Sequence, residues 1–137
     1  MARFLLDTNV LSELARRRPA ATVTEWIRRR PPQDLATSVM VIGEILHGVI
    51  RLEAHEPTQA QHLRRWLEEI EATHLVLPVD EPVIREWARL RAVQERGGDF
   101  EDMLIGATAL AHRLTVVTRN VRDFAVLGVP VLDPWQA

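Results

Sequence analysis

The sequence predicts an α/β domain of three layers, a central parallel sheet of about five strands with helices on both faces. Short apolar runs alternate with segments whose apolar residues recur at helical spacing, and strands separated by helices pair in parallel. The 137 residues suffice for one domain with a substantial core and are too few for two. No internal repeat, low-complexity tract or long linker divides them. We therefore expect residues 1–137 to form a single domain.

The N-terminal segment predicts one strand followed by two helices. Arg3–Leu6 is typical of a buried strand, and a helix should follow over about residues 9–17, because its apolar residues lie on one face. Thr22 and Glu25 have the spacing of a capping box, which would open a second helix. That helix should end near Arg30, before two consecutive prolines.

The middle of the chain repeats this alternation. Leu35–Ser38 is a short strand that leads into an apolar helix over about residues 39–52. Thr58 and Gln61 form a second potential capping box, for a helix with apolar residues at helical spacing. Leu75–Val79 is again strand-like.

The C-terminal part contains the clearest strand pattern. A helix should open at Asp80, and another over about residues 101–113 should run directly into the strand Thr115–Thr118. A short helical turn and a last strand near Val129–Leu132 complete the domain.

Composition narrows the classes of function. The chain has no cysteine, which excludes disulfides and thiolate metal sites and fits a reducing cytosol. Glu44 and His47 interrupt the longest apolar stretch, so it is too short for a membrane span. Asp7 follows the start too closely for the apolar centre of a secretion signal. We expect a soluble, cytoplasmic protein with no membrane partner.

All 17 basic residues are arginine, and seven of them fall within the first thirty residues. The planar guanidinium group matches phosphate geometry, so this bias permits a nucleic-acid partner. An arginine-rich proteome, together with the preference of cations for helix C-termini, would explain the same bias.

Acidic residues follow the strands at the edge where chemistry gathers in parallel sheets. Asp7 ends the first strand, and Glu44 lies in the second turn of the helix that leaves the second strand. Asn120 and Asp123 come directly after the strand that ends at Thr118. We expect all of these side chains to lie at the carboxyl edge of the sheet.

Asp102 reaches the same edge by a different route. Its helix feeds into the strand Thr115–Thr118 with almost no connection, so the helix and the strand must run antiparallel. The start of the helix therefore lies at the carboxyl end of that strand. Four carboxylates on one edge would repel each other without a cation, whereas Mg²⁺ or Mn²⁺ prefers such oxygen ligands.

Each acidic residue also has a structural interpretation. Asp7 could be a turn or N-cap residue, and the pairs Asp99–Asp102 and Asn120–Asp123 have the spacing of helix caps. Glu44 lies among apolar residues, where an unpaired carboxylate is costly, so an ion pair with an arginine is its alternative.

Other candidate sites are weaker. The five histidines lack zinc-site spacing, and the four tryptophans are more typical of a core or interface than of base stacking. The pair Gly97-Gly98 follows a helix rather than a strand and so fails the context of a phosphate-binding loop.

These acidic residues lie in four segments that together resemble a known family. The chain is similar, nearly end to end, to the PIN-domain nucleases, specifically the VapC/FitB-type toxins of bacterial toxin–antitoxin pairs. The tail Pro134-Trp135 also resembles the FitB type. The four segments occur in family order and spacing: LLDTNVLSE from Leu5, EILHG from Glu44, DMLIGATA from Asp102 and VTRNVRDF from Val117.

The resemblance implies a PIN-like fold and a metal-dependent endoribonuclease. It implies Asp7, Glu44 and Asp102 as the acidic core, with Asp7 and Asp102 as direct ligands of Mg²⁺ or Mn²⁺. At the fourth position relatives use either of two places, here Asn120 and Asp123, and we expect Asp123. The supporting residues are Thr8, Asn9, Thr118 and Asn120.

The resemblance also implies partners and a product. It implies a cognate antitoxin, a homodimer, and an antitoxin complex that binds operator DNA. The apolar segments 39–52 and 63–70 could supply the dimer interface or be buried within the chain. Hydrolysis of RNA by a metal-activated water would leave a 5′-phosphate and a 3′-hydroxyl.

Two other functions compete with this interpretation. A phosphatase of the haloacid dehalogenase type also places Asp after its first strand, but it needs a second acid two residues later, where this chain has Asn9. A non-catalytic module that binds nucleic acid or an antitoxin has no need for clustered negative charge beside a polyanion.

Overall fold

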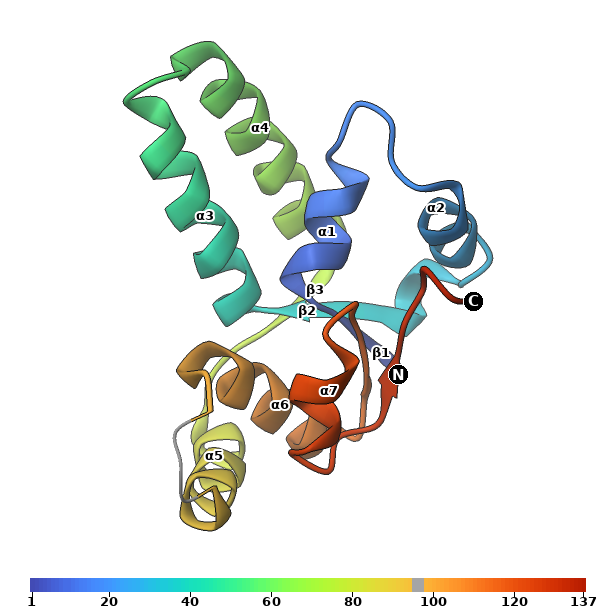
Figure 1. Cartoon of the computed structure of the whole chain (residues 1–137), viewed down its shortest axis with the longest axis vertical. Helices are drawn as coiled ribbons and strands as arrows, with labels where there is room; N and C mark the ends of the chain where they lie inside the picture. Colours follow the sequence, from blue (N-terminus) through green and yellow to red (C-terminus); the bar gives the residue numbers. More distant parts are fainter. Residues whose placement is uncertain (95–97) are drawn as a thin grey trace.

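The predicted three-layer α/β fold is confirmed by the computed structural model, which describes residues 1–94 and 98–137. Gly97 of the glycine pair lies outside the described residues. The elements follow one another along the chain as drawn in Figure 1. They are β1 (Phe4–Leu6), α1 (Thr8–Leu14), α2 (Ala21–Arg28), a 3₁₀ turn (Pro32–Asp34), β2 (Leu35–Ser38), α3 (Val39–Glu53), α4 (Pro57–Thr73), β3 (Leu75–Leu77), α5 (Glu81–Val93), α6 (Phe100–His112), β4 (Thr115–Val117), α7 (Val121–Ala125) and β5 (Val131–Leu132).

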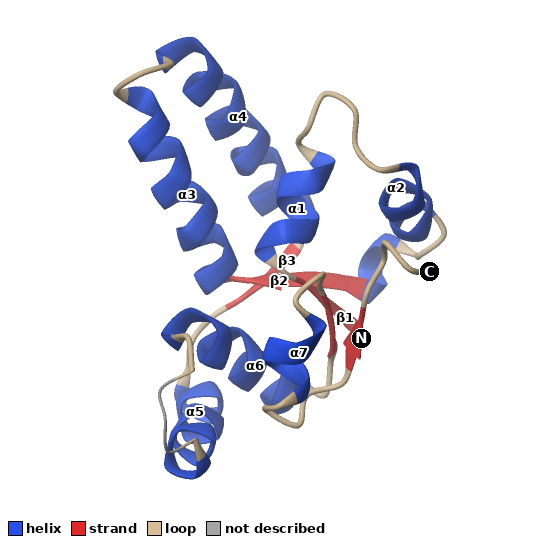
Figure 2. Ribbon diagram, viewed as in Figure 1, coloured by secondary structure: helices blue, strands red, loops and turns tan. Residues whose placement is uncertain are grey.

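The described strands form one parallel sheet in the order β3-β2-β1-β4-β5. The chain moves outward from β1 to β3, then returns to the other side of β1 for β4 and β5. Right-handed crossovers therefore place the first helices on one face and the last ones on the other, as Figure 2 shows for α1, α3 and α4 against α5, α6 and α7. The order reverses between β1 and β4, and a crevice at the carboxyl ends of these strands results.

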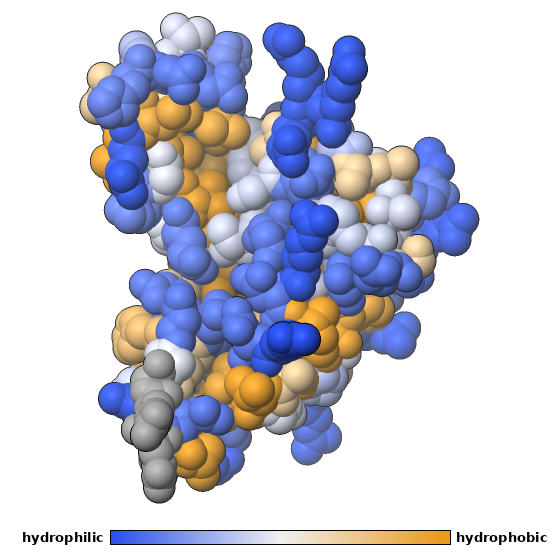
Figure 3. Space-filling model, viewed as in Figure 1, coloured by the Kyte–Doolittle hydropathy of each residue, from blue (hydrophilic) through white to orange (hydrophobic). Residues whose placement is uncertain are grey.

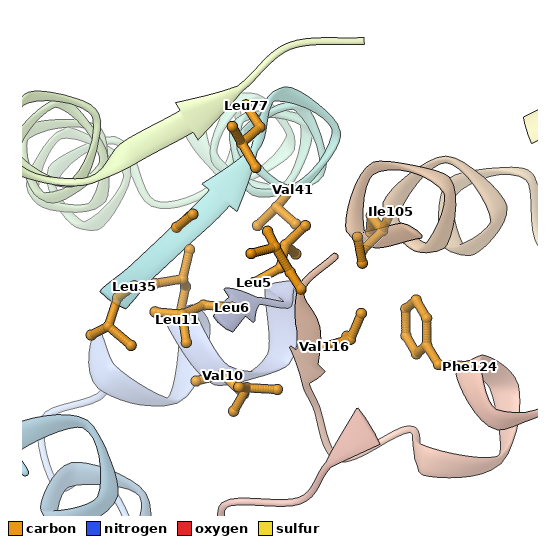
Figure 4. Close-up of a cluster of buried hydrophobic side chains, with 14 of the residues drawn as sticks. Leu5, Leu6, Val10, Leu11, Leu35, Val41, Leu77, Ile105, Val116 and Phe124 are labelled. Atoms are coloured by element: carbon orange, nitrogen blue, oxygen red, sulfur yellow. The ribbon is translucent and has the colours of Figure 1, made fainter. Parts of the chain in front are cut away.

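The core fills both faces of this sheet because the side chains of each strand alternate between them. Leu5 and Leu6 of β1 are completely buried, as are Val116 of β4 and Phe124 of α7. Figure 4 shows these side chains converging with others from α1 and α6. The strands are only two to four residues long, so this packing fixes their ends and the residues that follow them.

Two of the predicted helix starts are wrong. Ala20, not Thr22, precedes α2, and its side chain makes no capping hydrogen bond. Glu56 precedes α4, which starts at Pro57, so Thr58 lies inside the helix. Proline lacks the N–H that a first helical residue does not need and has its φ preset for the helix, which moves the start of α4 forward.

The first helix is also shorter than predicted, because α1 ends at Leu14 rather than near residue 17. Glu13 explains the difference. Its buried carboxylate accepts hydrogen bonds from the Ala20 N–H at 2.8 Å and from Arg16 Nη1 at 3.3 Å. The hydrogen bond to the Ala20 N–H draws the segment after α1 back across the end of the helix. By contrast, the predicted start of α5 is confirmed, with the Asp80 side chain capping the Val83 N–H.

Candidate functional site

Asp7 lies between the end of β1 and the start of α1, with only 3% of its surface exposed. Its Oδ1 accepts a hydrogen bond from the Thr8 N–H at 2.8 Å, so it is the N-cap of α1. Its Oδ2 accepts a second bond from Thr118 Oγ1, also at 2.8 Å. Burial raises the pKa of Asp7, while these two hydrogen bonds oppose the rise. The capping role leaves Asp7 able to bind a further group, because each carboxylate oxygen keeps a free lone pair.

Thr118 connects β4 to this carboxylate. Its hydroxyl, fully buried, donates to Asp7 and accepts from Asn9 Nδ2 at 3.1 Å and from the Asn120 N–H at 3.0 Å. Asn9 in turn accepts the Arg119 N–H at 3.2 Å. Asn9 and Thr118 thus tie the ends of β1 and β4 together around Asp7. The Asn120 side chain makes no capping hydrogen bond to α7, so the capping alternative for Asn120 and Asp123 is wrong.

Glu44 lies in α3, half-buried, and its Oε1 accepts a hydrogen bond from Thr8 Oγ1 at 2.9 Å. Burial raises its pKa, and the negative charges of Asp7, Glu101 and Asp99 add to the rise. Among the described residues no arginine pairs with Glu44, so this part of the structure does not support the ion-pair alternative. Thr8 joins this carboxylate to the start of α1.

Asp102 lies in the first turn of α6, whose start is capped by Asp99. Burial is the main cause that raises the pKa of Asp102 to about 7, and four carboxylates add to it. In decreasing order they are Asp99, Asp7, Asp123 and Glu44. The structure agrees with the prediction that α6 brings Asp102 to the carboxyl edge of the sheet. The charges of Asp7 after β1, Glu44 in α3 and Asp123 in α7 all help to raise its pKa.

Asp123 is the fourth carboxylate predicted for the site, and it comes from α7. It is exposed in α7, and it lines a cavity of about 180 Å³ together with Asp99 and Asp102. From the sequence we expect Asp99 only as a possible helix cap, and it does cap α6. Its further electrostatic action on Asp7, Glu44 and Asp102 was not predicted. The only signal in the sequence was its position three residues before Asp102.

The donor chemistry of this acidic site suits a hard divalent cation. In the part of the chain that the structure describes, the carboxylates of Asp7, Glu44, Asp102 and Asp123 form no ion pair. Their mutual repulsion is what a cation would relieve. Across residues 1–94 and 98–137, however, no three acidic, histidine or cysteine side chains are arranged to hold a metal ion as they stand. The structure therefore groups these carboxylates around Asp102 without a preformed metal cage among the described residues.

A groove of about 370 Å³ leads away from Glu44 between α1, α3 and α4. Its wall is largely apolar and includes Ile45, Val49, Leu63 and Trp66. Figure 3 shows this apolar surface between α3 and α4, next to hydrophilic side chains. No helix among the described residues is both long and apolar enough to cross a membrane.

Comparisons with known proteins agree with this geometry. A family model described as the PIN domain matches residues 4–129. The chain is 34% identical to "Toxin FitB" of Neisseria gonorrhoeae, over 96% of this chain and 97% of that protein. It is 32% identical to "VapC ribonuclease Y4jK" of Sinorhizobium fredii, over 96% and 97% respectively.

Solved structures give the same result. The structure of FitAcB from Neisseria gonorrhoeae matches with a TM-score of 0.83 and 31% identity, over 98% of this chain and 99% of that one. The structure of FitAB bound to an IR36 DNA fragment matches with a TM-score of 0.86 and 32% identity, over 96% and 95%.

Proposed function

The chain belongs to the PIN-domain family, and we propose on this basis that it is a metal-dependent endoribonuclease, the toxin of a toxin–antitoxin pair. The observation that carries the proposal is the meeting of four carboxylates from β1, α3, α6 and α7, none of them paired with a basic side chain in the described residues. The relatives named as a toxin and as a ribonuclease support the same activity.

Asp7, Glu44, Asp102 and Asp123 would hold Mg²⁺ or Mn²⁺, with Asp7 and Asp102 as the direct ligands. When bound, the cation lowers the pKa of a coordinated water and offsets the charge that develops on the phosphate during hydrolysis. No side-chain nucleophile is required, and cleavage leaves a 5′-phosphate and a 3′-hydroxyl.

The surrounding residues position these carboxylates. Thr118 holds Oδ2 of Asp7 at 2.8 Å, and the Thr8 hydroxyl holds Oε1 of Glu44 at 2.9 Å. Each bond leaves lone pairs on the carboxylate directed elsewhere, so the side chains are oriented in advance. Asn9 orients Thr118 through its amide.

The partners in this proposal are an antitoxin, RNA and a second copy of the chain. Two neighbouring structures are of complexes bound to DNA, FitAB and a VapBC from Salmonella typhimurium, so we propose that the antitoxin complex binds operator DNA. The apolar groove beside Glu44 suits a peptide segment of the antitoxin that would cover the acidic site. We propose that the protein acts on RNA in the cytoplasm.

The phosphatase alternative is less well supported. Asn9, which stands where a second acid is needed, is occupied by its hydrogen bonds to Thr118 and to the Arg119 N–H. A purely binding module does not explain why the acidic side chains converge.

The test is cleavage of total RNA by the purified protein in EDTA, in Mg²⁺ and in Mn²⁺. We expect cleavage only with a divalent cation, and a loss of at least about 100-fold in Asp7→Asn and Asp102→Asn, because each removes a charged ligand. Asp34→Asn is the matched control, since Asp34 precedes β2 at the opposite edge of the sheet. Undiminished cleavage in EDTA, or full activity of the two site variants, would refute the proposal.

A further inference from the structure

A second pocket, of about 440 Å³, adjoins the acidic site at the carboxyl ends of β4 and β5. Asp123 lines both this pocket and the cavity that contains Asp102, so the two are adjacent. The side chains around it are more basic than those of the acidic site: Arg119, Asn120, Val121, Arg122, Asp123 and Asp133.

The Arg119 side chain is held in place at this pocket. Its guanidinium carbon lies 4.8 Å from the centre of the Trp135 ring, within the range of a cation–π interaction. Its main-chain N–H is fixed by Asn9. The main chain of Trp135 is anchored as well, because its backbone N–H donates to Asp133 Oδ1 at 2.9 Å. A guanidinium group stacked by its face keeps its N–H edges available for an anion.

The arginines of this pocket form no ion pair among the described residues, unlike several of the arginines on the helices. Arg28, Arg29 and Arg85 each pair with a glutamate on their own helix. Among the described residues, neither Arg119 nor Arg122 forms an ion pair.

Two carboxylates also line the pocket. Asp133 accepts a hydrogen bond from the main-chain N–H of Trp135, and neither Asp133 nor Asp123 forms an ion pair among the described residues. Two exposed guanidinium groups therefore lie beside the acidic site without an ion-pair partner among the described residues.

We infer that Arg119, Arg122 and Trp135 form a binding site for a phosphate group of the RNA strand, next to the phosphodiester that is cleaved. This inference rests on the proposed ribonuclease function. The acidic site by itself repels RNA, so the strand needs cationic contacts on its flank. Guanidinium groups bind phosphate in a two-pronged geometry, and Trp135 acts as a positioning residue for Arg119.

The experiment measures the affinity of a fluorescent single-stranded RNA in EDTA, where cleavage by a metal-dependent nuclease stops. We expect Arg119→Gln and Arg122→Gln each to raise Kd about tenfold, since each removes a charge-assisted hydrogen bond. Each should also reduce the slope of log affinity against log salt by about 0.7. Arg65→Gln is the matched control and should leave Kd unchanged, because it removes an exposed arginine of α4 that forms no ion pair among the described residues.

Two further measurements distinguish phosphate binding by Arg119, Arg122 and Trp135 from a purely structural role of these residues. In steady-state cleavage with Mn²⁺, KM should rise in the Arg119 and Arg122 variants while kcat stays within about twofold. Trp135→Ala should weaken RNA binding, and Trp135→Phe, which keeps an aromatic face, should restore most of it. Thermal unfolding of every variant shows whether the fold is intact.

The outcomes distinguish the inference from the proposed function. If the Arg119 and Arg122 variants bind RNA as Arg65→Gln does, the phosphate site is refuted even though cleavage stands. If these variants lose only the binding of an acidic peptide, the pocket serves a protein partner and the inference is likewise refuted. If the wild type cleaves no RNA, the proposed function fails, and the Kd values in EDTA still decide whether the pocket binds RNA.

Discussion

Neutralising Asp102 should stabilise the protein at neutral and alkaline pH. The pKa of Asp102 is raised from 3.8 to about 7, first by burial and then by the neighbouring carboxylates. Between these two values the folded state binds a proton that the unfolded state has lost, so stability falls as pH rises. The destabilisation is absent below about pH 4 and complete above about pH 7.

The magnitude follows from the shift. Taken in full, a change from 3.8 to about 7 corresponds to about 4 kcal/mol. Asp102 is only half-buried, and solvent screening reduces this to about 1–2 kcal/mol. Asp102→Asn removes the charge and keeps the shape of the side chain, so it should recover this amount at pH 8.

Urea unfolding in EDTA at pH 4, 5 and 8 tests the expectation. The midpoint of Asp102→Asn should exceed that of the wild type by about 0.5–1 M at pH 8, with a difference that shrinks toward pH 4. Asp34→Asn, which neutralises a partly buried carboxylate at the other edge of the sheet, should show no such pH-dependent gain. Added Mg²⁺ should narrow the difference, because it stabilises only the wild-type charge cluster. A variant no more stable than the wild type at pH 8 would refute the electrostatic reasoning.

Three further expectations concern the residues around the site and the core. Thr118→Val should destabilise the fold by about 2 kcal/mol in urea unfolding, because the buried Asp7 carboxylate loses a donor; Thr118→Ser should recover most of this, and equal loss in both variants would contradict it. Thr8→Val should weaken Mn²⁺ binding about tenfold in titration calorimetry with little change in stability; unchanged affinity would argue against a positioning role. Leu11→Ala should cost about 3 kcal/mol, whereas Ile84→Ala, at a position 44% exposed, should cost far less.

Local patterns were sufficient to predict the elements of the fold. Strand Leu35–Ser38 has the predicted bounds, and Asp80 precedes α5 as expected, because strand periodicity and proline signals act over a few neighbouring residues. The helix starts at Ala21 and Pro57 were missed for the converse reason. A capping box, a proline and the packing of the core can each set the first residue of a helix, and the spacing of the box alone does not show which of them sets it.

The sequence by itself was sufficient to predict that Asp7, Glu44, Asp102 and Asp123 lie near one another, but not that Asp99 acts on three of them. Asp7 follows one strand, Asp123 follows another, and α6 must return to the same edge because it connects so directly to β4. These placements depend only on the order and direction of the elements, and the sequence specifies both.

Only the tertiary structure decided how these carboxylates are held and charged. The hydrogen bond from Thr8 to Glu44 spans 36 residues, and the one from Thr118 to Asp7 spans 111. The pKa of Asp102 depends on burial and on charges from separate helices. Likewise, the stacking of Arg119 on Trp135 joins residues that no local pattern connects. Hydrogen bonds and electrostatic interactions depend on distances in space, and these distances exist only once the chain has packed.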